Sequence, residues 1–133
     1  MWTEIKDQTG IDDLMGKFGC FHDSCIRDIY ISTEEFVDEK RSMCFNNVLT
    51  VSFLFQRQSR ENSVLELKFE AVTGIDYEQW FKERSTLTYE ATLEMENDLF
   101  YWANDLNLEI KGERVFWRFR PELVGNVKRI NED

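Results

Sequence analysis

The chain has 133 residues, of which 26 are acidic and 16 basic, and its formal net charge is -10. This charge argues against nucleic acids and anionic membrane surfaces as partners, because like charges repel. Hydrophobic residues make up 42% and aromatic residues 14%, which is too much apolar surface for a disordered protein. The length fits one domain, residues 1–133, with a polar C-terminal tail from about residue 127.

The cysteines and the N-terminus indicate the compartment. Three cysteines at irregular spacing do not form a disulfide framework, and an odd number without a signal peptide is typical of a reducing environment. The N-terminus has no basic leader, and no stretch approaches the roughly 18–20 apolar residues of a membrane span. We therefore expect a cytoplasmic protein that does not enter membranes.

The first predicted element is a short helix from Thr9 to Phe18. Thr9 is a suitable cap, and Asp12 and Asp13 would lie in the first turn, where the helix dipole favours anions. An apolar stripe marks one face of this helix, and it consists of Ile11, Leu14, Met15 and Phe18. Gly19 is expected to end the helix.

A strand from Cys25 to Ser32 is expected next, and the only histidine of the chain, His22, lies just before it. We also consider a strand that already begins at Cys20 and contains His22. Alternate side chains of a strand point to opposite faces, so His22 and Ser24 would share one face while Asp23 and Cys25 share the other. This alternation excludes a local Ser-His-Asp relay. We expect His22 and Asp23 to satisfy backbone groups at the entry to the sheet, with His22 partly buried.

A metal centre is the other chemical interpretation of this region. Cys20, His22, Cys25 and Cys44 are a ligand set that suits tetrahedral zinc. Zinc sites usually contain two close ligand pairs, whereas here three ligands are split across strand faces and the fourth is distant. We therefore expect no bound metal and no cofactor, and a protein that is zinc-free as purified.

Three later segments alternate apolar and polar residues, as strands with one solvated face do. Such strands are typical of antiparallel sheets. The apolar positions are Leu49, Val51, Phe53 and Phe55, then Leu65, Leu67, Phe69 and Ala71, then Leu87, Tyr89, Ala91, Leu93 and Met95. The acidic stretch from Thr33 to Arg41, which precedes them, is expected to be a loop or a helical turn.

Turn signals connect the remaining elements. Asn97-Asp98 suits a two-residue hairpin that pairs Met95 with Phe100 and Leu93 with Trp102. Lys111-Gly112 suggests a second hairpin, with Glu109 opposite Arg114 and Leu108 opposite Val115. Pro121 should end the last strand. Asp76 with Gln79 is expected to cap a single turn that carries Trp80 and Phe81.

These elements predict an α+β fold that is mainly β. We expect an antiparallel sheet or two-layer sandwich of about six or seven strands with one N-terminal helix. The expected core consists of Leu49, Val51, Phe53, Phe55, Leu67, Phe69, Leu93 and Phe116.

The order of several short motifs carries a resemblance. They are Phe21-His22-Asp23-Ser24-Cys25-Ile26, residues 51–58 (VSFLFQRQ), residues 65–70 (LELKFE), Ala91-Thr92-Leu93, and residues 98–103 (DLFYWA). The chain resembles a family of small, acidic, uncharacterised bacterial proteins with a Phe-His-Asp-Ser motif and a later Leu-Phe-Tyr-Trp hairpin. Related proteins are similar to toxin-immunity families, which implies a small acidic protein that neutralises a toxin. The resemblance supplies no catalytic residue.

The favoured function is a non-enzymatic protein-binding module, an immunity-type inhibitor of a cationic protein toxin. Its contact residues would be His22 and Asp23 together with the exposed acids of the solvated sheet face, Glu66, Glu70, Glu90, Glu94 and Glu96. One alternative is a small enzyme or ligand-binding protein with a pocket around His22, Asp23 and Cys25, joined by Trp80, Tyr101 or Trp102. The other is a homodimer or larger homo-oligomer whose function lies in assembly.

Overall fold

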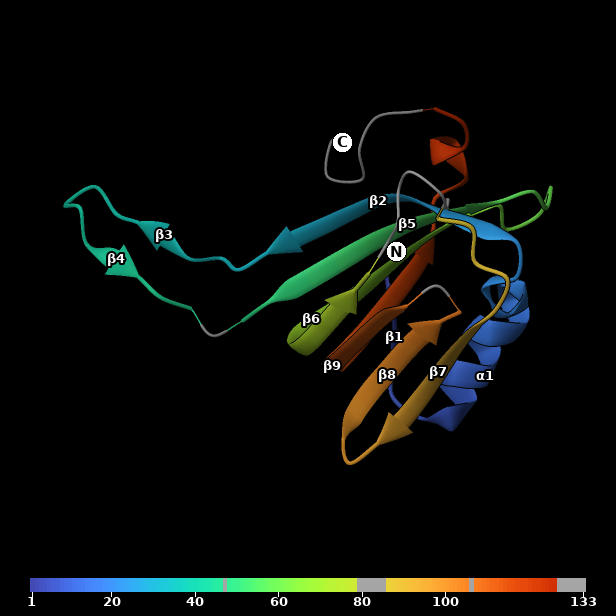
Figure 1. Cartoon of the computed structure of the whole chain (residues 1–133), viewed down its shortest axis with the longest axis horizontal. Helices are drawn as coiled ribbons and strands as arrows, with labels where there is room; N and C mark the ends of the chain where they lie inside the picture. Colours follow the sequence, from blue (N-terminus) through green and yellow to red (C-terminus); the bar gives the residue numbers. More distant parts are fainter. Residues whose placement is uncertain (47, 79–85, 106, 127–133) are drawn as a thin grey trace.

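The computed structural model describes residues 1–46, 48–78, 86–105 and 107–126 (Figure 1). The chain is mainly β, as the sequence predicts. The elements in chain order are β1 (Thr3–Ile5), α1 (Gln8–Lys17), η1 (Gly19–Phe21), β2 (Ser24–Ser32), β3 (Phe36–Val37), β4 (Met43–Cys44), β5 (Thr50–Arg57), β6 (Val64–Tyr77), β7 (Ala91–Glu96), β8 (Leu99–Asn104), β9 (Leu108–Phe119) and η2 (Pro121–Leu123).

The described residues form a seven-stranded antiparallel sheet and a separate two-stranded hairpin. The strand order in the large sheet is β2-β5-β6-β9-β8-β7. β1 pairs with β9 beside Val115–Trp117, whereas β8 pairs with β9 beside Glu109–Gly112. β9 therefore changes its neighbour halfway along. The predicted antiparallel sheet of six or seven strands with one helix is confirmed.

The second predicted hairpin is wrong. Lys111 and Gly112 lie inside β9, which pairs with β6 along its whole length. The chain continues through Lys111-Gly112 without a turn, and β6 has a bulge opposite these residues, between Val72 and Gly74. An added Cβ on Gly112 would lie 3.3 Å from the carbonyl oxygen of Glu70, and a glycine inside a strand is typical of such a close approach.

Helix α1 starts one residue earlier than predicted and has a different cap. Asp7, not Thr9, accepts the capping hydrogen bond, from the backbone N–H of Gly10 at 2.9 Å. The apolar stripe is confirmed, since Ile11, Leu14 and Phe18 are buried in the main core. The chain leaves the helix through Gly19, whose φ of +58° favours glycine.

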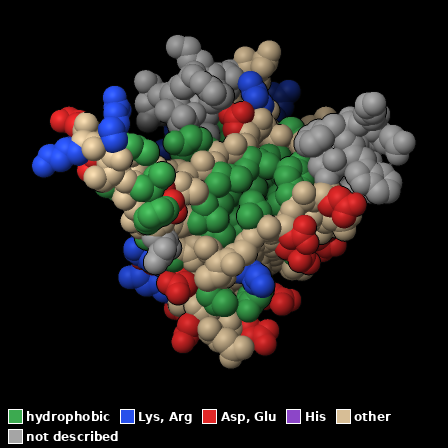
Figure 2. Space-filling model, turned by 60° about the vertical axis from the view of Figure 1, so that its left-hand side comes forward, with side chains coloured by type: hydrophobic (Ala, Val, Ile, Leu, Met, Phe, Trp, Pro, Cys, Tyr) green, Lys and Arg blue, Asp and Glu red, His purple; other side chains and the backbone are tan. Residues whose placement is uncertain are grey.

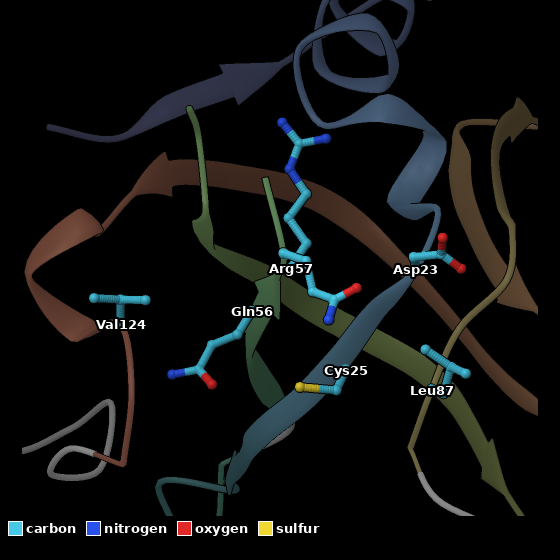
Figure 3. Close-up of a pocket in the computed structure, with 7 residues that line it drawn as sticks. Asp23, Cys25, Gln56, Arg57, Leu87 and Val124 are labelled. Atoms are coloured by element: carbon cyan, nitrogen blue, oxygen red, sulfur yellow. The ribbon is translucent and has the colours of Figure 1, made fainter. Parts of the chain in front are cut away.

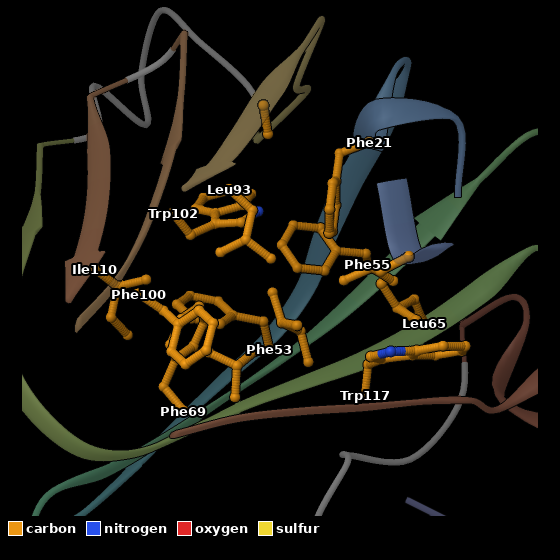
Figure 4. Packing of buried hydrophobic residues seen from close by; sticks show 14 of the residues in the cluster. Phe21, Phe53, Phe55, Leu65, Phe69, Leu93, Phe100, Trp102, Ile110 and Trp117 are labelled. Carbon is orange, nitrogen blue, oxygen red and sulfur yellow. The ribbon is translucent and has the colours of Figure 1, made fainter. Parts of the chain in front are cut away.

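The core is formed by one face of the sheet, including β7 and β8, together with α1 and η1 (Figure 4). Six of the eight predicted core residues are buried, namely Val51, Phe53, Phe55, Leu67, Phe69 and Leu93. Leu49 is partly buried and packs against the same cluster. Phe116 was predicted wrongly, because it lies outside this core, between the cations of Lys68 and Arg114, at 5.0 and 4.8 Å from its ring centre.

The first predicted hairpin is confirmed. Met95 pairs with Phe100 and Leu93 with Trp102. Asn97 and Asp98 adopt φ values of 52° and 63°, the left-handed conformation that a tight hairpin turn needs. The predicted strand from Leu87 is shorter than expected and begins at Ala91.

Pro121 ends the last strand as predicted, since β9 stops at Phe119 and η2 begins at Pro121. Asp76 is not a helix cap. It lies in β6 opposite Glu109, and Gln79, Trp80, Phe81 and the predicted polar tail from residue 127 lie outside the described residues. Among the described helices, none is long and apolar enough to cross a membrane.

The acidic segment from Thr33 to Arg41 was predicted to be a loop or helical turn, but it contains a strand. Phe36 pairs with Cys44 and Val37 with Met43. Asp38 closes the turn between them by accepting hydrogen bonds from the backbone N–H groups of Lys40 and Ser42, each at 2.9 Å. We call residues 33–46 the arm. It extends away from the sheet, beyond β2 and β5 (Figure 1).

Candidate functional site

The Phe21-His22-Asp23-Ser24 motif forms a turn that leads into β2, which begins at Ser24. Gly19, Cys20 and Phe21 all have φ between 53° and 61°, so the chain is not extended from Cys20, whereas the strand expected from Cys25 to Ser32 is confirmed as β2. Phe21 is fully buried, with its ring centre 4.9 Å from that of Phe55. The buried hydroxyl of Ser24 donates to the carbonyl oxygen of Phe21 at 2.8 Å. Phe21 and Ser24 therefore hold the turn in place.

His22 and Asp23 project outward from this turn. Their side chains are 64% and 51% exposed, and His22 Nδ1 lies 3.2 Å from Asp23 Oδ2. The expectation that His22 is partly buried is therefore wrong. Ser24, rather than His22 or Asp23, satisfies the backbone of the junction.

Two substitutions in this motif should have different effects. We expect His22→Ala to change the free energy of unfolding by less than about 0.5 kcal/mol, as exposed surface changes usually do. Ser24→Ala removes a buried hydrogen bond and should cost about 1–2 kcal/mol. Urea unfolding of both variants checks this. A loss for His22→Ala equal to that for Ser24→Ala would contradict the outward placement of the imidazole.

An open pocket of about 560 Å³ lies beside the start of β2 (Figure 3). Asp23 and Cys25 line it, as the enzyme alternative expects, but His22 does not. The other lining residues are Gln56, Arg57, Gln58, Leu87 and Val124. Trp102 is buried in the core, where it packs on Phe53, Tyr101 lies on β8, and Trp80 falls outside the described residues. The structure therefore brings Asp23 and Cys25 together in this pocket, but not His22, Tyr101 or Trp102.

Arg57, the cation of this pocket, is engaged in structural contacts. Its guanidinium donates to the carbonyl oxygens of Lys17, Glu61 and Asn62 at 2.9–3.2 Å and lies 4.6 Å from the ring centre of Phe18. Burial lowers the pKa of Arg57. These contacts connect the end of β5 to α1. The guanidinium of Arg57 therefore has a structural role, and most of its hydrogen-bond donors are already used.

The cysteines lie in separate parts of the structure. Cys20 is exposed in the turn before β2, Cys25 lies in β2 and Cys44 in the arm. In the part of the chain that the structure describes, no group of three or more His, Cys, Asp or Glu side chains is placed to hold a metal ion. The zinc-free state remains a prediction, to be checked by elemental analysis.

The five predicted contact acids do not form one exposed face. Glu90, Glu94 and Glu96 are exposed, on or next to β7. Glu70 is half-buried and bound to Arg114 and Lys68, each at 3.3 Å. Glu66 was wrongly expected to be exposed, because it is buried at the centre of the sheet between Arg118 and Arg120, with oxygen-to-nitrogen distances of 2.7 and 2.8 Å.

The arm carries the main surface feature that the sequence interpretation missed. Large hydrophobic side chains are exposed along it and next to its root, and they are Tyr30, Ile31, Phe36, Val37, Met43, Phe45 and Val48. Figure 2, in which the arm's side of the molecule comes forward, shows hydrophobic side chains gathered in the middle of that face, with both acidic and basic side chains around them. The signal in the sequence is the apolar pairs Phe36-Val37 and Met43 with Phe45 inside a polar stretch.

Comparisons with protein-family models, curated proteins and solved structures find no match to this chain.

Proposed function

We propose that this chain is a non-enzymatic protein-binding module that uses the arm to bind a cationic protein. The observation that carries the proposal is the exposure of large apolar side chains on the arm, with Phe36 at 60% and Phe45 at 77%. A two-stranded hairpin is only marginally stable alone in water, so contact with a partner would both bury these side chains and stabilise the arm.

Charge supports a cationic partner. The arm carries exposed Glu34, Glu35 and Glu39 beside its apolar residues. With Asp38 its four acids outnumber its two bases, Lys40 and Arg41, and the whole chain has a net charge of -10. Opposite charge speeds encounter and rejects wrong partners, while buried apolar contacts supply affinity. A toxin with a basic surface has the required chemistry, which agrees with the immunity role that the resemblance implies.

The arm should be essential for binding. If a basic protein is encoded next to this chain's gene, it is the first partner to test. We expect Phe36→Ser and Phe45→Ser each to weaken its binding at least about tenfold, because each removes an aromatic side chain that the partner would bury. Isothermal titration calorimetry measures the effect. Affinity should also fall as the salt concentration rises, since exposed charges are then screened.

Tyr89→Ser is the matched control. Tyr89 is 58% exposed but follows Thr88 in the segment before β7, outside the arm, so its loss should leave affinity unchanged. Equal affinity for the wild type and both arm variants would contradict the proposal. A neighbourhood of metabolic genes without a toxin would favour the enzyme or ligand-binding alternative instead.

A further inference from the structure

Strand β2 is the last strand on one side of the large sheet, and the described residues pair with its outer edge only at one end. Its inner edge pairs with β5. On the outer edge, Ser24 accepts from the backbone N–H of Thr88 at 2.7 Å, and Ile26 exchanges hydrogen bonds with the hydroxyl of Thr86 at 3.0 and 3.2 Å. Beyond Ile26, no described strand pairs with this edge as far as Ser32.

The pairing shows which backbone groups face outward. Residues of an antiparallel strand alternate between its two neighbours, and Leu49 and Arg57 of the β5 segment bond toward β6, to Val72 and Ser63. Val51 and Phe53 lie an even number of positions from Leu49 and Arg57, so their backbone groups also bond toward β6. Their partners in β2 are Ile29 and Ile31, so the N–H and C=O groups of Ile29 and Ile31 point to the outer edge.

The outer half of β2 lacks the devices that usually protect a sheet edge. A bulge between Ile26 and Asp28 and the charge of Asp28 protect the first half. The second half, residues 29–32, contains no lysine or proline. Tyr30 and Ile31 are instead 43% and 51% exposed there. An unprotected edge with apolar side chains is a template for another strand.

We infer that an extended segment of the cationic partner adds to the sheet as a strand along residues 29–32 of β2. This inference rests on the proposed function and names how the partner docks. Backbone hydrogen bonds from Ile29 and Ile31 would supply affinity, and alternate side chains of the added strand would contact Ile31 on one face and Tyr30 on the other. The added strand would end beside the arm, which follows Ser32 directly.

Charge argues for a basic segment rather than a second copy of this chain. Two copies paired through β2 would bring together two chains of net charge -10, with Glu34 and Glu35 of both chains close to the shared edge. Like charges at a pairing edge are destabilising, whereas lysines of an added strand would be attracted to the same acids.

The test uses the full chain and an acetylated ten-residue peptide of alternating lysine and valine as the probe. Amide hydrogen exchange is followed by NMR. At saturating peptide, exchange at Ile29 and Ile31 should slow at least about fivefold, while Thr92 on β7 should be unchanged. The same peptide with glutamate in place of lysine is the matched control and should give no protection.

Two variants of the edge separate docking from loss of fold. Ile31→Pro removes an outward N–H and should abolish protection at Ile29. Ile31→Lys keeps the backbone N–H and is the second variant, in case the proline variant does not fold. It should weaken binding of the lysine peptide at least about threefold, because the new lysine repels the lysines of the peptide. Near-ultraviolet circular dichroism checks that each variant is folded.

Three results would overturn the inference: slow exchange at Ile29 and Ile31 in the free monomer, a dimer of the wild type that Ile31→Lys disrupts, or no protection by the lysine peptide at any concentration at which it stays soluble. The arm variants distinguish failure of the strand addition from failure of the proposed function.

If Ile29 and Ile31 show no protection but binding of the cationic protein still depends on Phe36 and Phe45, only the strand addition fails. If binding is also insensitive to both phenylalanines, the proposed function fails as well.

Discussion

Replacing Phe53 with alanine is expected to lower the free energy of unfolding by about 3–5 kcal/mol. Phe53 is fully buried in the centre of the core, and its ring centre lies within 5.8–6.4 Å of those of Phe55, Trp102 and Phe69 (Figure 4). Its removal leaves a cavity that the surrounding sheet, fixed by pairing on both sides of β5, cannot close. Urea unfolding monitored by fluorescence measures the loss.

Phe45→Ala is the matched control, because the same side chain is 77% exposed on the arm. It should change stability by less than about 0.5 kcal/mol. A loss below about 1 kcal/mol for Phe53→Ala would place Phe53 at the surface and contradict the assignment of the sheet faces.

Glu66→Ala should have the second largest effect, a loss of about 2–4 kcal/mol. The carboxylate is 7% exposed and accepts from both Arg118 and Arg120, whose own side chains are 24% and 13% exposed. Removing it leaves two partly buried guanidinium groups next to each other without their shared anion. Arg120 would keep Glu122, at 2.7 Å, so the loss should stay below that of a fully buried ion pair.

Glu94→Ala is the control for charge removal, because Glu94 is exposed on β7. Its stability should remain within about 0.5 kcal/mol of the wild type. Equal stability of the two glutamate variants in thermal and urea unfolding would contradict the structural role assigned to Glu66.

The sequence predicted the regular part of the sheet well because side-chain alternation and turn chemistry are local signals. Alternation from Leu49 to Phe55 and from Leu65 to Phe69 marked the central strands, and Asn97-Asp98 fixed the register of β7 with β8. Burial of individual acids depends on neighbours that are distant in sequence. Glu66 has the pattern of a solvated residue, and only the approach of Arg118 and Arg120, more than fifty positions later, makes it a buried one.

The false hairpin has a specific cause. The buried residues of β9 have even numbers up to Ile110 and odd numbers from Val115 onward. A turn at Lys111-Gly112 would produce the same change in the alternation. In the structure this change occurs where the neighbour of β9 changes from β8, beside residues 109–112, to β1, beside residues 115–117. Sequence alone does not separate a bent strand from two strands.

The candidate site was harder to predict than the fold. A left-handed conformation at Cys20 and Phe21 carries no sequence signal, so the exposure of His22 could not be foreseen. The arm was missed because each of its strands has only two paired residues, too few for alternation to be visible. Phe36 and Val37 are therefore included in the acidic stretch from Thr33 to Arg41, which the sequence predicts to be a loop or a helical turn.

The most direct test of the proposed protein-binding role is amide hydrogen exchange of the whole chain, alone and with a cationic protein found to bind it. We expect a complex in which protection is greatest at residues 29–32 of β2 and at 36–45 of the arm. Protection confined to the pocket around Asp23, Cys25 and Leu87, with the arm and the β2 edge unchanged, would contradict it.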